Sequence, residues 1–364
     1  MARKIKALVV DDSAFMRKSL SIMLESTGEI EVIATARDGQ EGVEMVKTKF
    51  PDIVTMDIEM PRMDGLTALQ KIMKEHPTPV LMVSSLTTEG AKETLKALEY
   101  GAVDFIPKEL SYVNVNIIKI KEDLVAKVKA IVSQKSLSLR LQRIQNLSVT
   151  KSSSSSAPKT EYISKTIPQI GYRSIALGIS TGGPMSLQRV IPKLSKKLSI
   201  PMFIVQHMPP KFTKSLAERL NGLSEVEVKE AEDKEIVKGG VVYIAPGGLH
   251  MTVEKLTSNQ NQIIISENPS DTLHRPCVDV MMNSVIKVYG KYTLGVIMTG
   301  MGRDGADAIK ELKIKGGYSI AQDEDSCVVY GMPKAIVDAG YADTILSLDR
   351  IGNEINKACG LWMI

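Results

Sequence analysis

Cysteine is scarce in this chain of 364 residues, and the scarcity excludes two kinds of cross-linked fold. The three cysteines, Cys277, Cys327 and Cys359, are widely spaced and form no C-x-x-C pair. A disulfide framework or a zinc ribbon needs paired cysteines, so neither is expected. An odd number of isolated thiols is typical of a reducing compartment, and we therefore expect a cytoplasmic protein.

Long apolar runs are also absent from the sequence. The N-terminus is basic, but its apolar stretch ends at Val10, before two aspartates. That stretch is too short for a signal peptide, and no segment approaches the ~20 apolar residues that span a bilayer. We therefore expect a protein that is not inserted in a membrane. Its 43% hydrophobic and 24% charged residues are typical of a globular protein, and its length favours two domains.

Residues 1–132 alternate between short apolar runs and amphipathic segments. The apolar runs predict strands at 5–10, 30–34, 53–56, 80–83 and 103–106. The helical periodicity predicts helices at 14–25, 39–49, 65–74 and 89–98, and a last one over about 117–131. Five such βα units with short connections predict an α/β fold with a doubly wound, parallel (βα)5 sheet. Ligands of these sheets bind at the carboxyl ends of the strands.

Charged and hydroxyl side chains lie at those carboxyl ends. Asp11 and Asp12 follow the first predicted strand, Asp57 follows the third, Ser84 the fourth and Lys108 the fifth. Carboxylates at one edge repel each other unless a cation neutralises them, and a hard divalent ion such as Mg²⁺ prefers oxygen ligands. An aspartate beside such an ion can accept a phosphoryl group, whose oxygens a lysine and a hydroxyl can bind. One aspartate alone is more simply a helix cap, but the set favours a phosphoryl site.

The stretches LVVDDSAFMR, PDIVTMDIEMPRMDGL, VLMVSS and GAVDFIPK resemble the receiver domain of bacterial response regulators. The resemblance covers residues 1–132 and implies phosphorylation at Asp57. It also implies that Lys108 and Ser84 bind the phosphoryl group and that Ser84 and Phe105 form the switch, with Phe105 in a place where many receivers have another aromatic. The implied Mg²⁺ ligands are the carboxylates of Asp11, Asp12 and Asp57 and the backbone carbonyl of Glu59.

Residues 133–170 are expected to separate two domains. An apolar stripe through Leu137, Leu141, Ile144 and Leu147 either continues the preceding helix or forms a separate docking helix. It is followed by KSSSSSAPKT, which has no large apolar side chain to order it. We therefore expect a helical and then Ser-rich, flexible linker, which would let the two domains be repositioned.

Alternation resumes over residues 171–364 and predicts a second, mostly parallel α/β domain. Strands are expected near 174–178, 201–205, 241–244, 263–266, 293–298 and 318–321. Helices are expected near 185–194, 212–221, 276–289, 305–314 and 332–338. The region 223–272 is also compatible with antiparallel strands.

The stretch GISTGGP, at 178–184, follows the first of these strands and precedes a helix. Its glycines permit a tight turn and Pro184 suits a first helical turn, so Ser180 and Thr181 are expected beside backbone N–H groups at a helix N-terminus. The first five residues also fit the G-x-S-x-G pattern of a nucleophile elbow. The pattern is short, and a capped βα turn without catalytic function is the alternative interpretation.

A serine nucleophile needs a base and an acid that orients the base. His207 directly follows a predicted strand and is therefore expected at the same sheet edge as Ser180, whereas His250 and His274 lie in looser surroundings. Asp304, in the Gly-rich stretch MTGMGRDGA, follows another predicted strand. These positions favour a Ser180–His207–Asp304 triad, although Asp304 could instead serve as the N-cap of the helix that follows it.

The stretches GISTGGP, QHMPP, IAPGG, HRPCVDVMM and TGMGRDGA resemble the catalytic domain of the chemotaxis protein-glutamate methylesterases, over essentially all of 171–360. The resemblance implies a triad of Ser180, His207 and Asp304, with Thr181 and the backbone of Met301 at the same site. The implied activity is phosphorylation-activated hydrolysis of glutamate γ-methyl esters, and deamidation of glutamines, on methyl-accepting chemotaxis receptors. The implied phosphodonor is the chemotaxis histidine kinase. Mg²⁺ is implied for the receiver, and no cofactor for the ester hydrolysis.

Two alternatives make different demands on the sequence. An α/β-hydrolase needs the order Ser–Asp–His, for which Asp271 and His274 are candidates, and an HGGG-type loop, which this sequence lacks. A response regulator with a DNA-binding output domain needs a helix-turn-helix or a basic reading surface. Residues 171–364 show neither pattern, so we expect no nucleic-acid partner.

Overall fold

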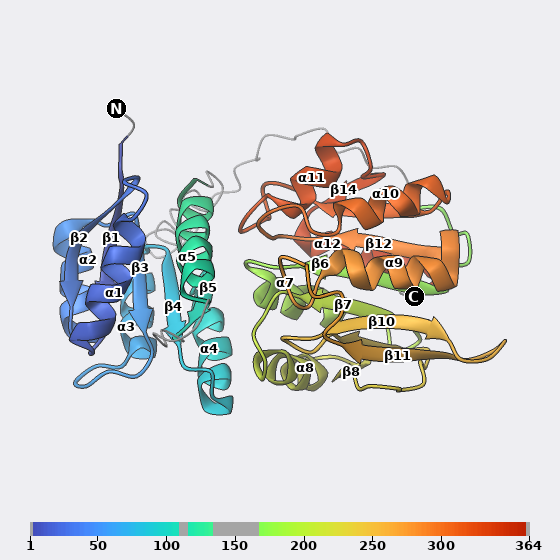
Figure 1. The fold of residues 1–364 in the computed structure, drawn as a ribbon, viewed down its shortest axis with the longest axis horizontal. Coiled ribbons are helices and arrows are strands. Elements are labelled where there is room, and N and C mark those ends of the chain that lie inside the picture. The colour runs from blue at the N-terminus through green and yellow to red at the C-terminus, as the bar shows by residue number, and fades with distance from the viewer. Residues whose placement is uncertain (1–2, 109–115, 134–166, 362–364) are drawn as a thin grey trace, which may run out of the picture. The chain divides into compact units, whose positions relative to one another are not determined.

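A computed structural model describes residues 3–108, 116–133 and 167–361. The chain divides into two compact units, Met1–Ser156 and Ala157–Ile364, which are described separately here (Figure 1). Most of the predicted linker, including its leucine-rich stripe and KSSSSSAPKT, lies outside the described residues. Within these described ranges, no helix is long and apolar enough to span a membrane.

The first unit is a five-stranded parallel sheet with the strand order β2-β1-β3-β4-β5. Its strands are β1 (Ile5–Val10), β2 (Ile30–Ala36), β3 (Ile53–Asp57), β4 (Val80–Ser84) and β5 (Asp104–Pro107). Its helices are α1 (Ala14–Glu25), α2 (Gly39–Lys49), α3 (Gly65–Glu75), α4 (Thr88–Glu99) and α5 (Asn116–Ser133). The predicted doubly wound arrangement is confirmed, and the predicted bounds differ from these by a few residues at most.

Short polar side chains begin four of these helices. Ser13, Asp38, Asp64 and Thr87 each accept a hydrogen bond from a backbone N–H in the first turn of the following helix. An N-cap of this kind stabilises a helix by ~1 kcal/mol. Because β3 and β4 are buried along their whole length, they read as apolar runs rather than as alternating patterns, as expected for a parallel sheet covered on both faces.

The second unit is a seven-stranded parallel sheet with the strand order β14-β13-β12-β6-β7-β9-β8. Its strands are β6 (Ser174–Ile179), β7 (Met202–Gln206), β8 (Glu227–Glu230), β9 (Val241–Ile244), β12 (Thr293–Ile297), β13 (Tyr318–Gln322) and β14 (Thr344–Leu346). An antiparallel pair, β10 (His250–Lys255) and β11 (Asn261–Ser266), lies within the region for which antiparallel strands were considered. The prediction of a mostly parallel α/β domain is confirmed.

The helices of the second unit are interspersed with its strands along the chain, and the last helix follows the last strand (Figure 1). They are α7 (Gly183–Val190), α8 (Phe212–Leu223), α9 (Val278–Tyr289), α10 (Ala306–Ile314), α11 (Met332–Asp338) and α12 (Leu348–Ala358), with short 3-10 turns at Ile191–Lys193 and Gly290–Tyr292. Met281, Met282 and Val285 of α9 are fully buried in an apolar cluster of the unit. Strands β8 and β14 and helix α12 were not predicted. Strand β8 reads EVKE with one fully buried side chain, so it carries no apolar run.

The chain reverses its direction of progress through the second sheet at β6. Strand β6 pairs with β7 on one side and with β12 on the other, and every residue of these three strands is buried. In open parallel sheets, ligands bind at the carboxyl ends of the strands beside such a point. Ser180, His207 and Asp304 come from the segments that follow β6, β7 and β12, which are neighbours in the sheet but far apart in the sequence.

Candidate functional site

Ser180 lies directly after β6, in the turn that begins α7. Its N–H donates to the carbonyl of Thr299 at 2.9 Å, and its own carbonyl accepts the N–H of Gly183 at 2.8 Å. Gly182, the N-cap of α7, has a φ of 76°, and a Cβ at this position would lie 2.4 Å from the side chain of Val328. Glycine is therefore required there. Ser180 is not among the described residues with positive φ, so the strained serine of an α/β-hydrolase elbow is not formed.

His207 is oriented by a carboxylate on one of its two ring nitrogens. Its Nε2 lies 2.8 Å from Oδ2 of Asp304, and its side chain is 8% exposed. A carboxylate with a low pKa can only accept here, so Nε2 carries the hydrogen of this bond. Nδ1 is buried and has no hydrogen-bond partner among the described residues. In this tautomer Nδ1 has a free lone pair and can act as a base.

Asp304 is held by the N-terminus of α9. Its carboxylate accepts the N–H of Val278 at 2.7 Å and that of Asp279 at 2.9 Å, and the thiol of Cys277 donates to it at 3.2 Å. The alternative that Asp304 caps the helix after it is wrong, because the N-cap of α10 is Gly305 and makes no side-chain bond. Burial raises the pKa of Asp304, but the hydrogen bond from His207 and these backbone donors outweigh it and hold the pKa well below its usual range. Asp304 is therefore an anion at neutral pH.

Asp279 completes a reciprocal pair of caps between α9 and α10. Its Oδ1 accepts the N–H of Ala308, in the first turn of α10, at 2.7 Å, whereas Asp304, just before α10, binds the first turn of α9. Burial, together with the nearby charge of Asp304, raises the pKa of Asp279 to about 6, although the bond from Ala308 lowers it. The position of Asp304 therefore depends on how the two helices pack. This packing cannot be predicted from a single stretch of sequence.

Two further histidines lie at or next to this site, so the expectation of looser surroundings is wrong for both. The ring of His274 stacks on that of His207, with centroids 4.2 Å apart and planes 24° apart. His250 is fully buried, and its Nδ1 accepts the N–H of Cys277 at 3.2 Å while Nε2 lies 3.1 Å from the carbonyl of Pro269. Burial lowers the pKa of His250, which favours this neutral form. His250 thus fixes the segment that carries His274 and begins α9.

Thr181 follows Ser180 in the chain, and Met301 follows Gly300, which approaches Ser180 in space. The Thr181 hydroxyl oxygen is buried without a hydrogen-bond partner in the described part of the chain. The segment before Met301 runs against the serine, because a Cβ on Gly300 would lie 2.8 Å from the Cβ of Ser180. The structure therefore brings the main chain of Gly300 beside the serine. Their role toward an oxyanion stays a prediction.

A second site lies at the carboxyl ends of β1, β3 and β5 in the first unit. Asp11, Asp12 and Asp57 each offer a carboxylate oxygen, and these oxygens lie within 4.8 Å of one another. Nζ of Lys108 lies 2.5 Å from Asp57 Oδ2 and 3.5 Å from Asp11 Oδ2. Burial raises the pKa of Asp57 to about 6 and raises that of Asp11 as well, although Lys108 opposes both shifts. Three carboxylates beside a single lysine, two of them buried, fit a hard divalent cation such as Mg²⁺.

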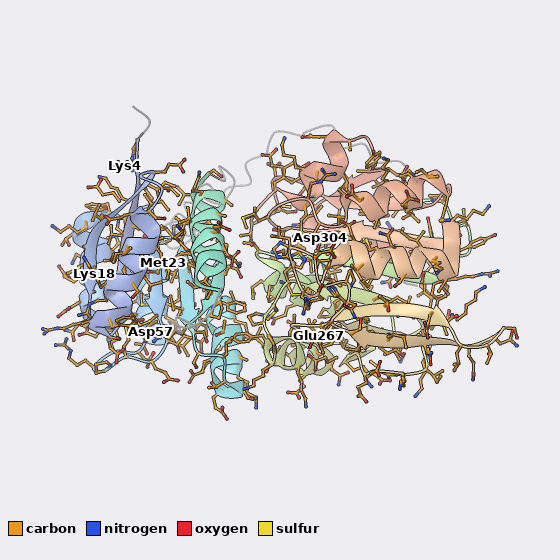
Figure 2. The ribbon with its side chains drawn as sticks, viewed as in Figure 1. Lys4, Lys18, Met23, Asp57, Glu267 and Asp304 are labelled. Carbon is orange, nitrogen blue, oxygen red and sulfur yellow. The ribbon has the colours of Figure 1, made fainter. Side chains whose placement is uncertain are left out.

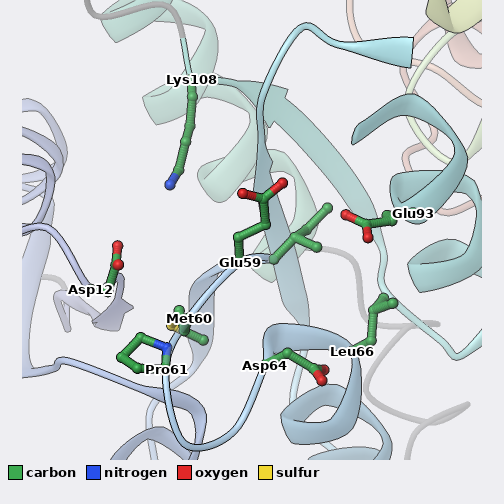
Figure 3. A pocket seen from close by; sticks show the side chains of 9 residues that line it. Asp12, Glu59, Met60, Pro61, Asp64, Leu66, Glu93 and Lys108 are labelled. Carbon is green, nitrogen blue, oxygen red and sulfur yellow. The ribbon is translucent and has the colours of Figure 1, made fainter. Parts of the chain in front are cut away.

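A cavity of about 680 Å³ opens beside these carboxylates. Figure 3 shows the side chains of Glu59, Glu93 and Lys108 pointing into it. A smaller cavity with several of the same lining residues also includes Asp57 and Ser84. The smaller cavity thus has Asp57, one lysine and two glutamates in its lining. The sequence analysis did not single out Glu93, because only its place on α4 brings it to this opening.

The two predicted switch residues are both buried. Ser84 is 1% exposed and Phe105 is 5% exposed. The hydroxyl of Ser84 accepts a hydrogen bond from that of Thr94 at 2.7 Å and lies 3.2 Å from the carbonyl of Gly90, both on α4. Among the hydrogen bonds of the described residues, none joins Ser84 to Asp57. Thr94 is a partner that the sequence analysis missed, since nothing but helix packing brings it to Ser84.

Comparison with known proteins covers both units. The family model described as CheB methylesterase matches residues 175–355, and that of the response regulator receiver domain matches 7–116. The protein-glutamate methylesterase/protein-glutamine glutaminase of Pyrococcus horikoshii is 46% identical over 98% of this chain and 94% of its own. Protein-glutamate methylesterase/protein-glutamine glutaminase 2 of Nitratidesulfovibrio vulgaris is 50% identical over 96% of this chain and 98% of its own.

A solved structure extends this comparison to the fold of the second unit. The crystal structure of the Thermotoga maritima CheB methylesterase catalytic domain is 42% identical and covers 53% of this chain and 100% of its own, with a TM-score of 0.50. Figure 2 labels Asp57 in the first unit and Asp304 in the second, so each unit carries one of the two sites described above.

Proposed function

This chain belongs to the family of protein-glutamate methylesterases/protein-glutamine glutaminases, and we propose that Ser180, His207 and Asp304 carry out its hydrolysis. The enzyme hydrolyses glutamate methyl esters of chemotaxis receptors, and its receiver domain places that activity under control by phosphorylation. The observation that carries the proposal is the 2.8 Å contact between His207 and an ionised Asp304 at the sheet edge where Ser180 lies.

Each step of the proposed reaction uses side chains of this chain and water. Ser180 Oγ attacks the ester carbonyl carbon while His207 Nδ1 takes the hydroxyl proton, and Asp304 stabilises the imidazolium that forms. The tetrahedral intermediate collapses, and the imidazolium protonates the departing methoxide to give methanol. Water then attacks the acyl carbon while His207 takes a proton from it, and the imidazolium returns that proton to Ser180 Oγ as glutamate is released. With a glutamine substrate the leaving group is ammonia.

Backbone N–H groups at the Ser180 turn and at Met301 are proposed to bind the oxyanion, with Thr181 supporting the turn. The close approach of Gly300 to Ser180 supports this proposal, since it brings the neighbouring main chain to the reacting atom. One such donor commonly changes the rate by ~10²–10³-fold.

In the receiver, Asp57 is proposed to attack the phosphorus of a phosphodonor, with a chemotaxis histidine kinase as its source in the cell. Asp11, Asp12, Asp57 and the carbonyl of Glu59 would hold Mg²⁺, which when bound neutralises charge at the acceptor site. Lys108, already 2.5 Å from Asp57, is placed to bind a phosphoryl oxygen. Ser84 would bind another after leaving Thr94.

Replacing His207 with alanine tests the choice of base. We expect kcat for methanol release from a methylated receptor fragment to fall by about 10⁶-fold, because triad members act as a unit. His274→Ala is the matched control, since it removes the ring stacked on His207 and leaves the bond to Asp304. A stack of this kind contributes ~0.5–1.5 kcal/mol, so a loss of about tenfold or less is expected. An inactive His274→Ala beside an active His207→Ala would show that the base is misassigned.

We further propose that the unphosphorylated receiver restrains hydrolysis at Ser180. The hydroxyl of Ser84 is bonded to Thr94 of α4, so drawing it toward phosphorylated Asp57 breaks that bond and changes the face near Phe105. A chain lacking residues 1–150 should therefore hydrolyse the ester faster than the unphosphorylated full chain and should ignore phosphodonors. A gain of at least about tenfold is expected if the open state is populated at ~0.1–10%. A fragment no faster than the resting full chain would mean that the receiver activates instead.

A further inference from the structure

The side chain of Gln206 joins the two residues proposed as nucleophile and base. Gln206 is the last residue of β7 and is 2% exposed. Its Nε2 donates to the carbonyl of Ser180 at 3.0 Å and to that of His207 at 3.2 Å. Both partners are carbonyl oxygens, which can only accept, so the NH₂ group must face them. The orientation of the amide therefore follows from its surroundings.

The amide lies where the regular pairing of the two strands ends. In the ladder, Ile179 of β6 is opposite Gln206, and the N–H of His207 still donates to the carbonyl of Ile179 at 3.2 Å. Beyond that bond, the two hydrogen bonds from Gln206 connect the segments that carry Ser180 and His207. They continue the connection between β6 and β7 past the point where the backbones diverge.

The carbonyl oxygen of the Gln206 amide does not stabilise the fold. Gln206 Oε1 is buried without a hydrogen-bond partner among the described residues, and such a group costs about 1–3 kcal/mol. It occupies space beside Gly183, where a Cβ would lie only 1.8 Å from it. An apolar side chain of the same length would fill this space without an unpaired oxygen. The two hydrogen bonds that the NH₂ group donates are therefore the reason for a polar side chain at this position.

We propose that Gln206 is a positioning residue for the esterase reaction, holding the main chain of Ser180 against that of His207 so that Ser180 Oγ meets His207 Nδ1. This inference rests on the proposed triad. A misplacement of ~1 Å between reacting groups can cost ~10²-fold in rate. Gln206→Met keeps the length of the side chain and removes its two donors. We expect kcat to fall by ~10–100-fold with KM nearly unchanged, because Gln206 is buried and does not face the substrate.

A second variant gives a readout that loss of packing alone would not produce. Gln206→Glu keeps the shape, but an ionised carboxylate would face two carbonyl oxygens and could donate to neither. Only its protonated form can restore one of the bonds. The activity of Gln206→Glu relative to the native chain should therefore rise as the pH falls, whereas that of Gln206→Met should stay constant.

Asn356 of α12 provides a control elsewhere in the second unit. It is 3% exposed, accepts the N–H of Ser195 at 3.0 Å and donates to the carbonyl of Lys193 at 2.8 Å. Like Gln206, it is a buried amide that bonds to main-chain groups, but neither of these partners bonds to Ser180 or His207. Asn356→Leu should therefore lower the free energy of unfolding at least as much as Gln206→Met does, with a much smaller loss of kcat.

The experiment measures methanol release by the full chain, with kcat, KM, pH profile and free energy of unfolding for each variant. A loss of kcat confined to the Gln206 variants, with recovery of Gln206→Glu at low pH, supports the proposal. Equal losses of kcat in Gln206→Met and Asn356→Leu, or a Gln206→Met with native kcat, overturn it. If Gln206→Met does not fold, Gln206→Glu decides, and a pH-independent ratio rejects the proposal. Ser180→Ala, measured alongside, distinguishes failure of this proposal from failure of the proposed triad, because an active Ser180→Ala would refute the triad itself.

Discussion

Ser180→Ala is expected to abolish ester hydrolysis, with kcat reduced by about 10⁶-fold, while the chain keeps its fold. The hydroxyl is the proposed nucleophile, and no other group of the site can replace it in forming an acyl-enzyme. The hydrogen bonds that place this residue involve its backbone, from its N–H to Thr299 and from Gly183 and Gln206 to its carbonyl. Alanine retains all of them. The measurement is methanol release from a methylated receptor fragment, with thermal unfolding to check the fold.

The control for this variant is another serine of the same turn and helix. Ser186 is 3% exposed, and its hydroxyl donates to the carbonyl of Gly182 at 2.9 Å. Ser186→Ala removes a buried hydroxyl and one hydrogen bond, so it should lose about 0.5–1.5 kcal/mol of stability and retain most of the activity. Hydrolysis by Ser180→Ala well above background would remove Ser180 from the mechanism.

Asp57→Asn is expected to take up no phosphoryl group from a small phosphodonor in the presence of Mg²⁺. An amide oxygen is a far weaker nucleophile than a carboxylate, yet asparagine has the same shape and can still accept a bond from Lys108, which is 2.5 Å from Asp57. The measurement is incorporation of labelled phosphate into the full chain. Chelation of Mg²⁺ should likewise prevent labelling of the native chain, because the three carboxylates would be left without a cation.

Asp104 offers a matched control in the same sheet. It is 3% exposed and pairs with Lys127 at 2.6 Å, so it is also a buried aspartate bonded to a lysine. Asp104→Asn should be less stable, since it weakens a buried ion pair, but should be phosphorylated normally. Label that persists in Asp57→Asn, on a different residue, would be incompatible with the acceptor site described here.

The positions of most site residues could be predicted because a parallel α/β sheet places the carboxyl end of every strand at one edge. Asp11, Asp57 and Lys108 end or follow apolar runs, and so do Ser180 and His207. An apolar run of four to six residues followed by a polar side chain is a local feature, readable without any knowledge of strand order. The elements that were missed lack this feature, as β8 does with its sequence EVKE.

The sequence around Gln206 has a feature from which its hydrogen bonding could have been predicted. It is a polar residue that ends an apolar strand directly before a histidine, in the stretch MFIVQH. A buried amide at a strand end needs hydrogen-bond partners, and the nearest acceptors are main-chain carbonyls of the neighbouring strand. Which strand is the neighbour could not be read from the stretch itself.

By itself the sequence determined that this protein has two α/β units, that each carries polar groups at its strand ends, and that these groups suit phosphoryl transfer in one and acyl transfer in the other. Only the tertiary structure decided which side chains meet. The strand order β12-β6-β7 brings together segments that are about 30 to 120 residues apart in the sequence. Because α9 packs against α10, the carboxylate of Asp304 binds the N-terminus of α9 and not that of the helix that follows it. Contacts of this kind depend on strand order and on the closest approach of packed helices, and local periodicity records neither.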